Sequence, residues 1–189
     1  MRVSEIFEEK PKQWGLRGDP HLWEDMKKEF ADVPVTVSAE AFREKFYEVF
    51  ERLTNKPLTS EIITYCSTTA QGGMSAGKVS GDFWLETALP LLLCRLEMYH
   101  ILEINHKYVV WKWDEKQGDV SKLPTDNLWI LDKDGQELWN IASFFGKSEM
   151  CIMVRLITEN QFYFYTFSGI GVMMEINDEI KCVDKKLVR

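Results

Sequence analysis

The segment whose spacing is most suggestive of chemistry is rich in glycine and serine. Gly72, Gly77 and Lys78 have the spacing of a phosphate-binding loop, in which a second glycine directly precedes a lysine. A loop that also holds magnesium needs a Ser or Thr hydroxyl at the next position, which is Val79 here. Such loops belong to βαβ units, and the alternating C-terminal half does not resemble one. The sequence therefore favours a glycine-rich connector over residues 71–81 and disfavours nucleotide hydrolysis.

The same connector could bind an anion without hydrolysing it. It leads into a helix expected from about Asp82, and the first N–H groups of a helix attract anions. Ser75 and Lys78 would add a hydroxyl group and a positive charge to that site. These two residues are the candidate binding residues of the connector.

A second unusual segment runs from Trp14 to Trp23 and places an Arg, an Asp and a His between two tryptophans. For binding, Arg17 would grip a carboxylate, Trp14 would offer a flat apolar contact and His21 would donate a proton. A structural interpretation explains the same residues, with Asp19 as a helix cap and both tryptophans at the edge of the core. We favour the structural interpretation and keep Trp14, Arg17, Asp19 and His21 as candidate binding residues.

No complete catalytic or metal-binding pattern is evident in the sequence. No two of the three histidines, His21, His100 and His106, have a metal-ligand spacing with a carboxylate or a thiolate. Gly73 to Gly77 has the Gly-x-Ser-x-Gly spacing of an activated serine, but no histidine or acid in the sequence is recognisable as a catalytic partner for Ser75. We expect no metal, no cofactor and no catalytic set, and the sequence favours a protein that binds over an enzyme.

Composition and cysteine usage indicate a cytoplasmic protein. The four cysteines stand singly in apolar stretches, which predicts buried free thiols in a reducing compartment. No apolar run follows Arg2 as in a signal peptide, and no segment approaches the ~18 apolar residues of a membrane span. The net charge of −7, from 30 acidic and 23 basic side chains, disfavours nucleic acid and favours a basic protein partner.

The spacing of apolar residues changes from helical to alternating near residue 105. Helices are expected over about residues 20–30, 38–54 and 82–96, the last kinked at Pro90, and a short strand over 61–67. Further strands are expected from residue 107 and over 128–131, 137–141, 150–158, 161–168, 171–176 and 180–183. The strands over 150–158 and 161–168 carry apolar residues on both faces and are expected to be covered on each side.

These patterns predict an α+β fold in which N-terminal helices, within about residues 1–105, pack on a C-terminal antiparallel β-meander, within about 106–189. No long linker or repeat interrupts the chain, so we expect a single domain over residues 1–189.

In general composition the chain resembles the small acidic immunity proteins with which bacteria neutralise polymorphic toxins, although the resemblance covers no motif. It implies an inhibitory protein that binds a basic toxin or nuclease through acidic and aromatic surface. The alternative is a small enzyme or ligand-binding domain, with an anion pocket between the 72–81 loop and the 14–23 segment. A homo-oligomer joined through an exposed sheet face or edge is a third possibility.

Overall fold

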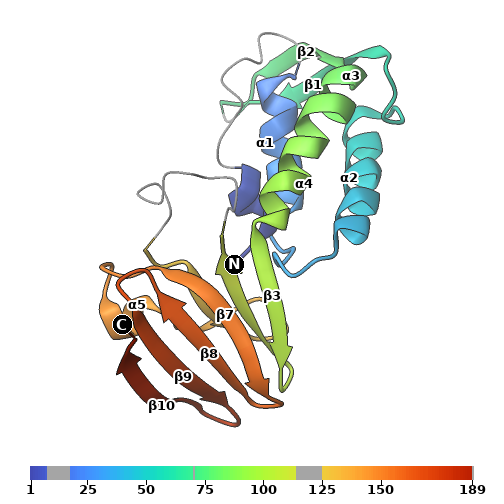
Figure 1. Ribbon diagram of the computed structural model, residues 1–189. Helices are drawn as coiled ribbons and strands as arrows, with labels where there is room; N and C mark the ends of the chain where they lie inside the picture. Colours follow the sequence, from blue (N-terminus) through green and yellow to red (C-terminus); the bar gives the residue numbers. More distant parts are fainter. Residues whose placement is uncertain (8–17, 70, 114–124, 189) are drawn as a thin grey trace. The chain divides into compact units, whose positions relative to one another are not determined.

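The computed structural model describes residues 1–7, 18–69, 71–113 and 125–188 (Figure 1). Two of the candidate binding residues, Trp14 and Arg17, lie outside the described residues. The chain divides into two compact units, one of residues 2–97 and one of residues 98–189 with Met1. Within the described parts, no helix is long and apolar enough to cross a membrane.

The unit of residues 2–97 is mainly helical and also carries one β-hairpin. Its helical elements are a 3₁₀ helix (Val3–Phe7), α1 (Pro20–Glu29), α2 (Ala39–Thr54), α3 (Gly81–Phe83), a π-helical turn (Trp84–Ala88) and α4 (Leu89–Glu97). Its strands are β1 (Ile62–Thr68) and β2 (Met74–Ser80), which form a two-stranded antiparallel sheet.

Side-chain caps fix the start of the first two helices, as the sequence predicts. The Asp19 carboxylate accepts the backbone N–H of His21, and the Ser38 hydroxyl accepts that of Ala41. Pro20 occupies the first turn of α1, where a missing N–H costs nothing. The predicted bounds of both helices are confirmed to within a residue or two.

Aromatic side chains build the core of this unit. Neighbouring ring centroids are 4.9 to 6.5 Å apart along the chain of contacts formed by Phe7, Trp23, Phe30, Phe42, Phe46, Trp84 and Phe50. The indole N–H of Trp23 donates to the carbonyl of Phe7 at 3.0 Å, which ties the 3₁₀ helix to α1. The expected role of Trp23 as a core residue is therefore confirmed.

The third predicted helix exists, but a π-helical turn interrupts it just before Pro90. Pro90 has no N–H to donate to the carbonyl of Glu86, so the regular α-helical bonding pattern cannot continue through this point. The N–H of Leu89 donates five residues back to Trp84 instead. The irregularity expected at Pro90 thus takes the form of a π turn.

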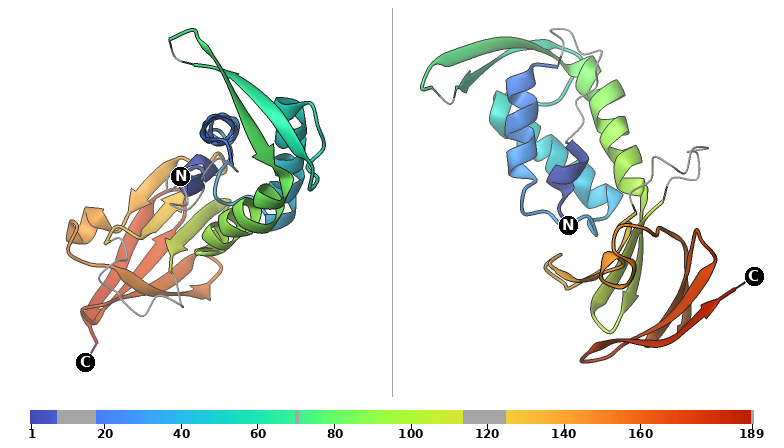
Figure 2. Two further views of the ribbon diagram at one scale, coloured as in Figure 1. Left: turned by 90° about the horizontal axis from the view of Figure 1, so that it is seen from above. Right: turned by 90° about the vertical axis from the view of Figure 1, so that its left-hand side faces the viewer.

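The predicted glycine-rich connector over residues 71–81 is wrong, because most of it is strand β2. All seven residues of β2 pair in register with β1, from Thr68 opposite Met74 to Ile62 opposite Ser80. Val79 is fully buried and anchors the strand, although its neighbours have little β-propensity. Figure 2 shows the hairpin extending past α1 and α2 of its unit.

The unit of residues 98–189 contains two four-stranded antiparallel sheets. One has the order β3-β4-β5-β6, made of Tyr99–Ile104, Lys107–Lys112, Leu128–Leu131 and Glu137–Asn140. The other has the order β10-β9-β8-β7, made of Ile180–Leu187, Ile170–Ile176, Gln161–Thr166 and Cys151–Thr158. A short helix, α5 (Ala142–Phe145), connects them. Strand β3 is missed by the sequence analysis, since it follows α4 almost directly.

Both sheets contribute to one hydrophobic core in this unit. Ile104, Val109 and Ile130 from the first sheet pack with Phe162, Phe164 and Val172 from the second. Neighbouring strands in space are neighbours in sequence, as in a meander. The predicted fold class, α+β with N-terminal helices and C-terminal antiparallel sheets, is confirmed; the single-domain organisation stays a prediction.

Two expectations about burial are corrected. All four cysteines are free, but only Cys151 is buried. Burial raises the pKa of its thiol to about 12 and makes it unreactive. The other three stand on outward faces, where an apolar neighbour in sequence does not imply an apolar neighbour in space. Strand β7 lies at an edge of its sheet and is likewise not covered on both sides, since Met153, Leu156 and Ile157 are exposed on it.

Candidate functional site

Helix α1 and the β1–β2 hairpin meet at two aspartates. Asp19 is buried, and its carboxylate lies against Gly77 of β2 so closely that a Cβ there would be 1.7 Å from Oδ2. Asp19 also has a positive φ of 45°, which Asp tolerates better than most residues. The structure therefore brings the segment before α1 together with the predicted glycine-rich stretch, through an acid and a glycine.

The second aspartate, Asp25, is held by a hydrogen-bond network. The hydroxyl of Tyr65 donates to Asp25 Oδ2 at 2.6 Å and that of Ser67 donates to the same oxygen at 2.9 Å. Lys28, on the same helix, donates to Oδ1 at 2.7 Å. Asp25 therefore ties α1 to strand β1.

This network is suited to holding the hairpin and not to proton transfer. Burial raises the pKa of Asp25, but hydrogen bonds from Lys28, Tyr65 and Ser67 outweigh it and leave the pKa below its ordinary value. Burial and the bond to Asp25 raise the pKa of Tyr65 well above its ordinary value. A strongly bound proton on Tyr65 and an ionised Asp25 are poor partners for acid–base catalysis near neutral pH.

The remaining candidate residues lie on different surfaces. Ser75 and Gly77 are on the hairpin face that meets α1, since strand side chains alternate. Lys78 is exposed and belongs to the opposite face. His21 is exposed near the start of α1. Lys78 therefore lies on a different hairpin face from Ser75 and from the contact that Asp19 makes with Gly77, and most of the 71–81 stretch is a strand and not a loop.

A hollow lies on that opposite side, at the base of the hairpin. It measures about 410 Å³ and is lined by Ile62, Ser80, Asp82, Phe83, Glu86 and Thr87. Ile62 and Ser80 are paired across the hairpin, and the other four residues come from α3 and the π turn. Gly81 makes this junction possible, because a Cβ on it would lie 1.2 Å from the backbone carbonyl oxygen of Thr59.

The hollow combines negative charge with exposed apolar surface. Asp82 and Glu86 are both exposed, lie four residues apart, and meet no Lys or Arg in the lining. The helix dipole stabilises Asp82 in the first helical turn, but it does not explain the apolar surface beside it. Ile62 is 70% exposed, which is costly for a large aliphatic residue.

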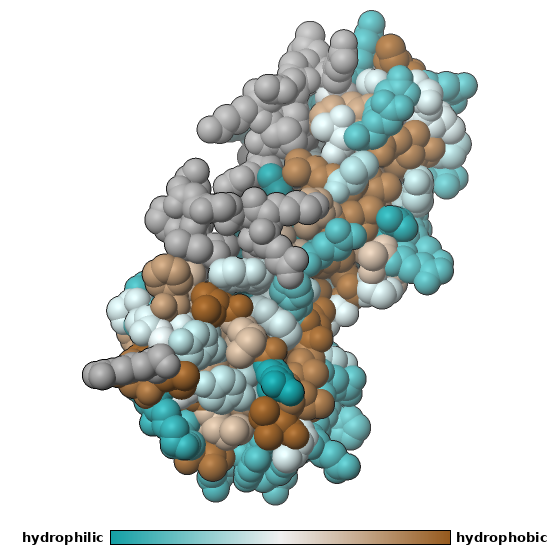
Figure 3. All heavy atoms as spheres, in the orientation of Figure 1, coloured by the Kyte–Doolittle hydropathy of each residue, from teal (hydrophilic) through white to brown (hydrophobic). Residues whose placement is uncertain are grey.

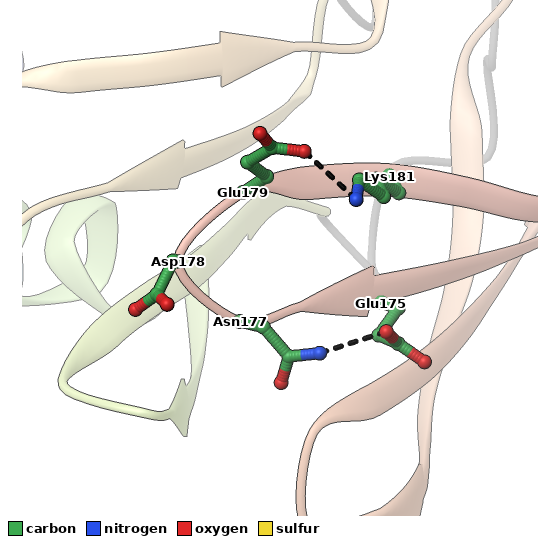
Figure 4. Close-up of a pocket in the computed structure, with 5 residues that line it drawn as sticks. All are labelled: Glu175, Asn177, Asp178, Glu179 and Lys181. Atoms are coloured by element: carbon green, nitrogen blue, oxygen red, sulfur yellow. Dashed lines mark hydrogen bonds and ion pairs between the residues drawn. The ribbon is translucent and has the colours of Figure 1, made fainter.

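A second hollow, of about 230 Å³, lies at the β9–β10 turn (Figure 4). Three of the four charged groups that line it already have partners: Lys181 contacts Glu179 at 2.8 Å, and Asn177 donates to Glu175 at 2.7 Å. Gln161 donates to the other oxygen of Glu175 at 2.8 Å. These contacts stabilise the turn and leave few polar groups that would bind a ligand.

The residues of the hairpin-base hollow carry no functional signal of their own in the sequence. Ile62 fell within a predicted strand and Asp82 at a predicted helix start, so each had an ordinary explanation. Only the pairing of β1 with β2 places them together. Predicting a strand over residues 74–80 would have placed Ser80 opposite Ile62. The residues of this segment have low β-propensity, so the sequence does not predict that strand.

Among the described residues, no group of three or more His, Cys, Asp and Glu side chains could hold a metal ion. Comparison of the chain with protein-family models, with curated proteins and with solved structures finds no match. The site must therefore be interpreted from its own chemistry.

Proposed function

We propose that this protein is a binding protein of the inhibitory kind, which neutralises a basic protein partner such as a toxin or nuclease. The observation that carries the proposal is the hollow at the hairpin base, where two carboxylates stand beside exposed Ile62 and half-buried Phe83. A protein surface of this composition matches a lysine or arginine side chain. Such a side chain has an apolar stem and a charged end.

Each part of a lysine or arginine side chain has a matching group in the hairpin-base hollow. The methylene stem of the partner's side chain would lie over Ile62, and its charged end would reach Asp82 and Glu86. Two like charges four residues apart on a helix repel by a few tenths of a kcal/mol, roughly, and a cation between them turns that repulsion into attraction. The net charge of −7 would increase the rate of encounter with a basic partner.

The hydrogen-bond network at Asp25 supports binding in preference to turnover, since its ionisable groups are held in fixed protonation states near neutral pH. The alternative, an anion pocket, has less support. Lys78 belongs to the hairpin face opposite the one that meets Asp19 and Asp25, and carboxylates repel anions. The four free thiols fit a protein that acts in the cytoplasm.

The test is affinity capture from the source cell with three baits, followed by mass spectrometry. The baits are the wild-type protein, Asp82→Lys/Glu86→Lys, and a control, Glu40→Lys/Glu44→Lys. The control reverses two exposed acids on α2 that are also four residues apart, so it changes the net charge by the same amount as the hollow variant. We expect a basic protein that the wild type and the control retain and the hollow variant loses.

Retention should also decrease between low and moderate salt, because exposed charges are screened. A variant with Ile62→Ser should weaken retention without changing the net charge. If both charge-reversed baits lost the partner equally, net charge alone would explain the binding, and the hollow would be rejected as the binding site. Retention of no protein by the wild type would reject the proposed function.

A further inference from the structure

The outer face of the β7–β10 sheet is a regular surface that the proposed function does not use. Paired residues on neighbouring strands lie on the same face, so the register defines three rows across the sheet. The middle row consists of Arg155, Tyr163, Met173 and Asp184. The rows on either side consist of Met153, Tyr165, Gly171 and Lys186, and of Thr158, Gln161, Glu175 and Lys181.

The middle of this face carries residue types that are common in protein interfaces. Tyr, Met and Arg are the residue types enriched where proteins associate, and this face carries all three. Met153 is 45% exposed and Arg155 is exposed. The Tyr163 ring lies across Gly171, since a Cβ there would be 1.8 Å from the tyrosine hydroxyl. Hydrophobic, weakly polar and charged side chains intermingle over this face in Figure 3.

The charges on the face are arranged so that it complements itself. A two-fold axis that runs along the strands, between β8 and β9, would place β7 over β10 of a second copy and β8 over β9. Arg155 would then face Asp184 of that copy, and the same contact would repeat on the other side of the axis. Tyr163 would face Met173, a favourable sulfur–aromatic pair. In the outer rows each charged residue would face an uncharged one.

A two-fold axis that runs across the strands is disfavoured by charge. It would place β7 over β7 and β10 over β10, so that Arg155 faces Arg155 and Asp184 faces Asp184. Like charges that face each other across an interface cost binding energy. Sheets that pack face to face lie about 10 Å apart, a gap that an arginine and an aspartate can span together.

We propose that a second copy of this chain binds the outer face of β7–β10, giving a two-fold dimer with two Arg155–Asp184 ion pairs. Asp184 is 47% exposed and already contacts Lys186 at 2.6 Å on its own strand. In the dimer it would lie between that lysine and the incoming arginine. A central cluster of Tyr163 and Met173 would supply the apolar contact.

The experiment is sedimentation velocity of the full chain over a range of concentrations, with a charge swap. We expect the wild type to sediment as a dimer of the 22.1 kDa chain at high concentration. Arg155→Asp and Asp184→Arg should each weaken dimerisation by about tenfold or more, since each variant places like charges opposite each other at both symmetry-related contacts. The double variant, Arg155→Asp/Asp184→Arg, restores opposite charges and should restore the dimer.

Lys133→Asp is the matched control, since it makes a comparable charge change at an exposed residue of the β5–β6 turn. It should leave the dimer unchanged. A wild type that stays monomeric at every concentration would overturn the proposal. So would a dimer that neither single variant weakens, or a double variant that is as weak as the singles while circular dichroism shows all variants folded.

Discussion

At the scale of single residues, Asp25 illustrates how a polar contact can fix the position of a whole hairpin. Its carboxylate accepts hydroxyl hydrogens from Tyr65 and Ser67 on β1 while it remains bound to Lys28 on α1. The side chain of Asp25 is 20% exposed, so these bonds are partly shielded from water. Their contribution should therefore exceed that of a fully exposed ion pair.

The protonation states of this network define a range of pH in which it stabilises the fold. The pKa of Asp25 is lowered in the folded state, so its contribution is present above the unfolded value of about 3.9 and is lost as pH falls further. The pKa of Tyr65 is raised, so its contribution is present below about 10 and is lost as pH rises further. The network is therefore fully effective between these two values.

Replacing Asp25 by Asn should lower the free energy of unfolding at neutral pH by about 1–3 kcal/mol, because the ionic hydrogen bonds are lost. The difference from wild type should shrink as pH falls from about 5 to about 2, where Asp25 becomes protonated. Urea unfolding at several pH values measures both effects. Asp32→Asn, at an exposed residue, is the control. A difference that stays constant down to pH 2 would contradict the assignment.

Gly81 is a second residue whose role can be tested singly. A Cβ at this position would lie 1.2 Å from the carbonyl oxygen of Thr59, so Gly81→Ala must displace backbone. We expect destabilisation of about 1–3 kcal/mol, typical of overpacking, together with loss of whatever the hairpin-base hollow binds. Thermal unfolding measures the first effect. Gly73→Ala is the control, because its Cβ would meet only the hydroxyl of Thr69, at 3.2 Å.

At the scale of elements, the packing of β2 on α1 depends on the missing side chain at Gly77. A methyl group there would lie 1.7 Å from Asp19 Oδ2 and would force the capping carboxylate to move. Gly77→Ala should therefore cost about 1 kcal/mol or more, the typical value of a lost helix cap.

The double-mutant cycle makes this test specific. In an Asp19→Gly background the obstructing carboxylate is gone, and glycine accepts the positive φ, so Gly77→Ala should cost much less. Ala76→Ser, on the exposed face of β2, is the control. Chemical unfolding of the four proteins gives the coupling energy. Equal costs in the two backgrounds would contradict the contact.

The sequence predicts elements well where their own residues determine them. Helices α1 and α2 have capping residues and apolar positions at helical spacing, and both were predicted almost to the residue. The Phe and Tyr residues of β8 alternate, and the Phe residues do point inward. Strand β2 could not be predicted, because an isolated two-stranded hairpin is marginal and this one depends on contacts to α1.

The candidate site was predictable only in part, for the same reason. Asp19 was expected as a cap, and the cap is confirmed, but its contact with Gly77 joins residues 58 positions apart. Of the two carboxylates of the hairpin-base hollow, Asp82 had a local explanation at a predicted helix start and Glu86 lay within the same predicted helix. Both the Asp19–Gly77 contact and the hollow depend on the pairing of β1 with β2. The order of residue types along the chain is a poor predictor of which strands pair and in which register.

At the scale of the whole molecule, negative charge is spread along the chain. Residues 2–97 carry 16 acidic and 12 basic side chains, and residues 98–189 carry 14 and 11, so the two parts have net charges of −4 and −3. Under the proposed function, this balance would favour encounter with a basic partner. Specific recognition must then come from a local feature such as the hairpin-base hollow.

Whether the chain unfolds as one domain is the remaining question at this scale. The contacts divide into two compact units, yet no long linker separates them, and the sequence predicts a single domain. A single domain should give one calorimetric transition, with the calorimetric enthalpy equal to the van't Hoff enthalpy. Asp25→Asn should then shift that whole transition. If two transitions appear and Asp25→Asn shifts only one of them, residues 2–97 unfold on their own and the chain has two domains.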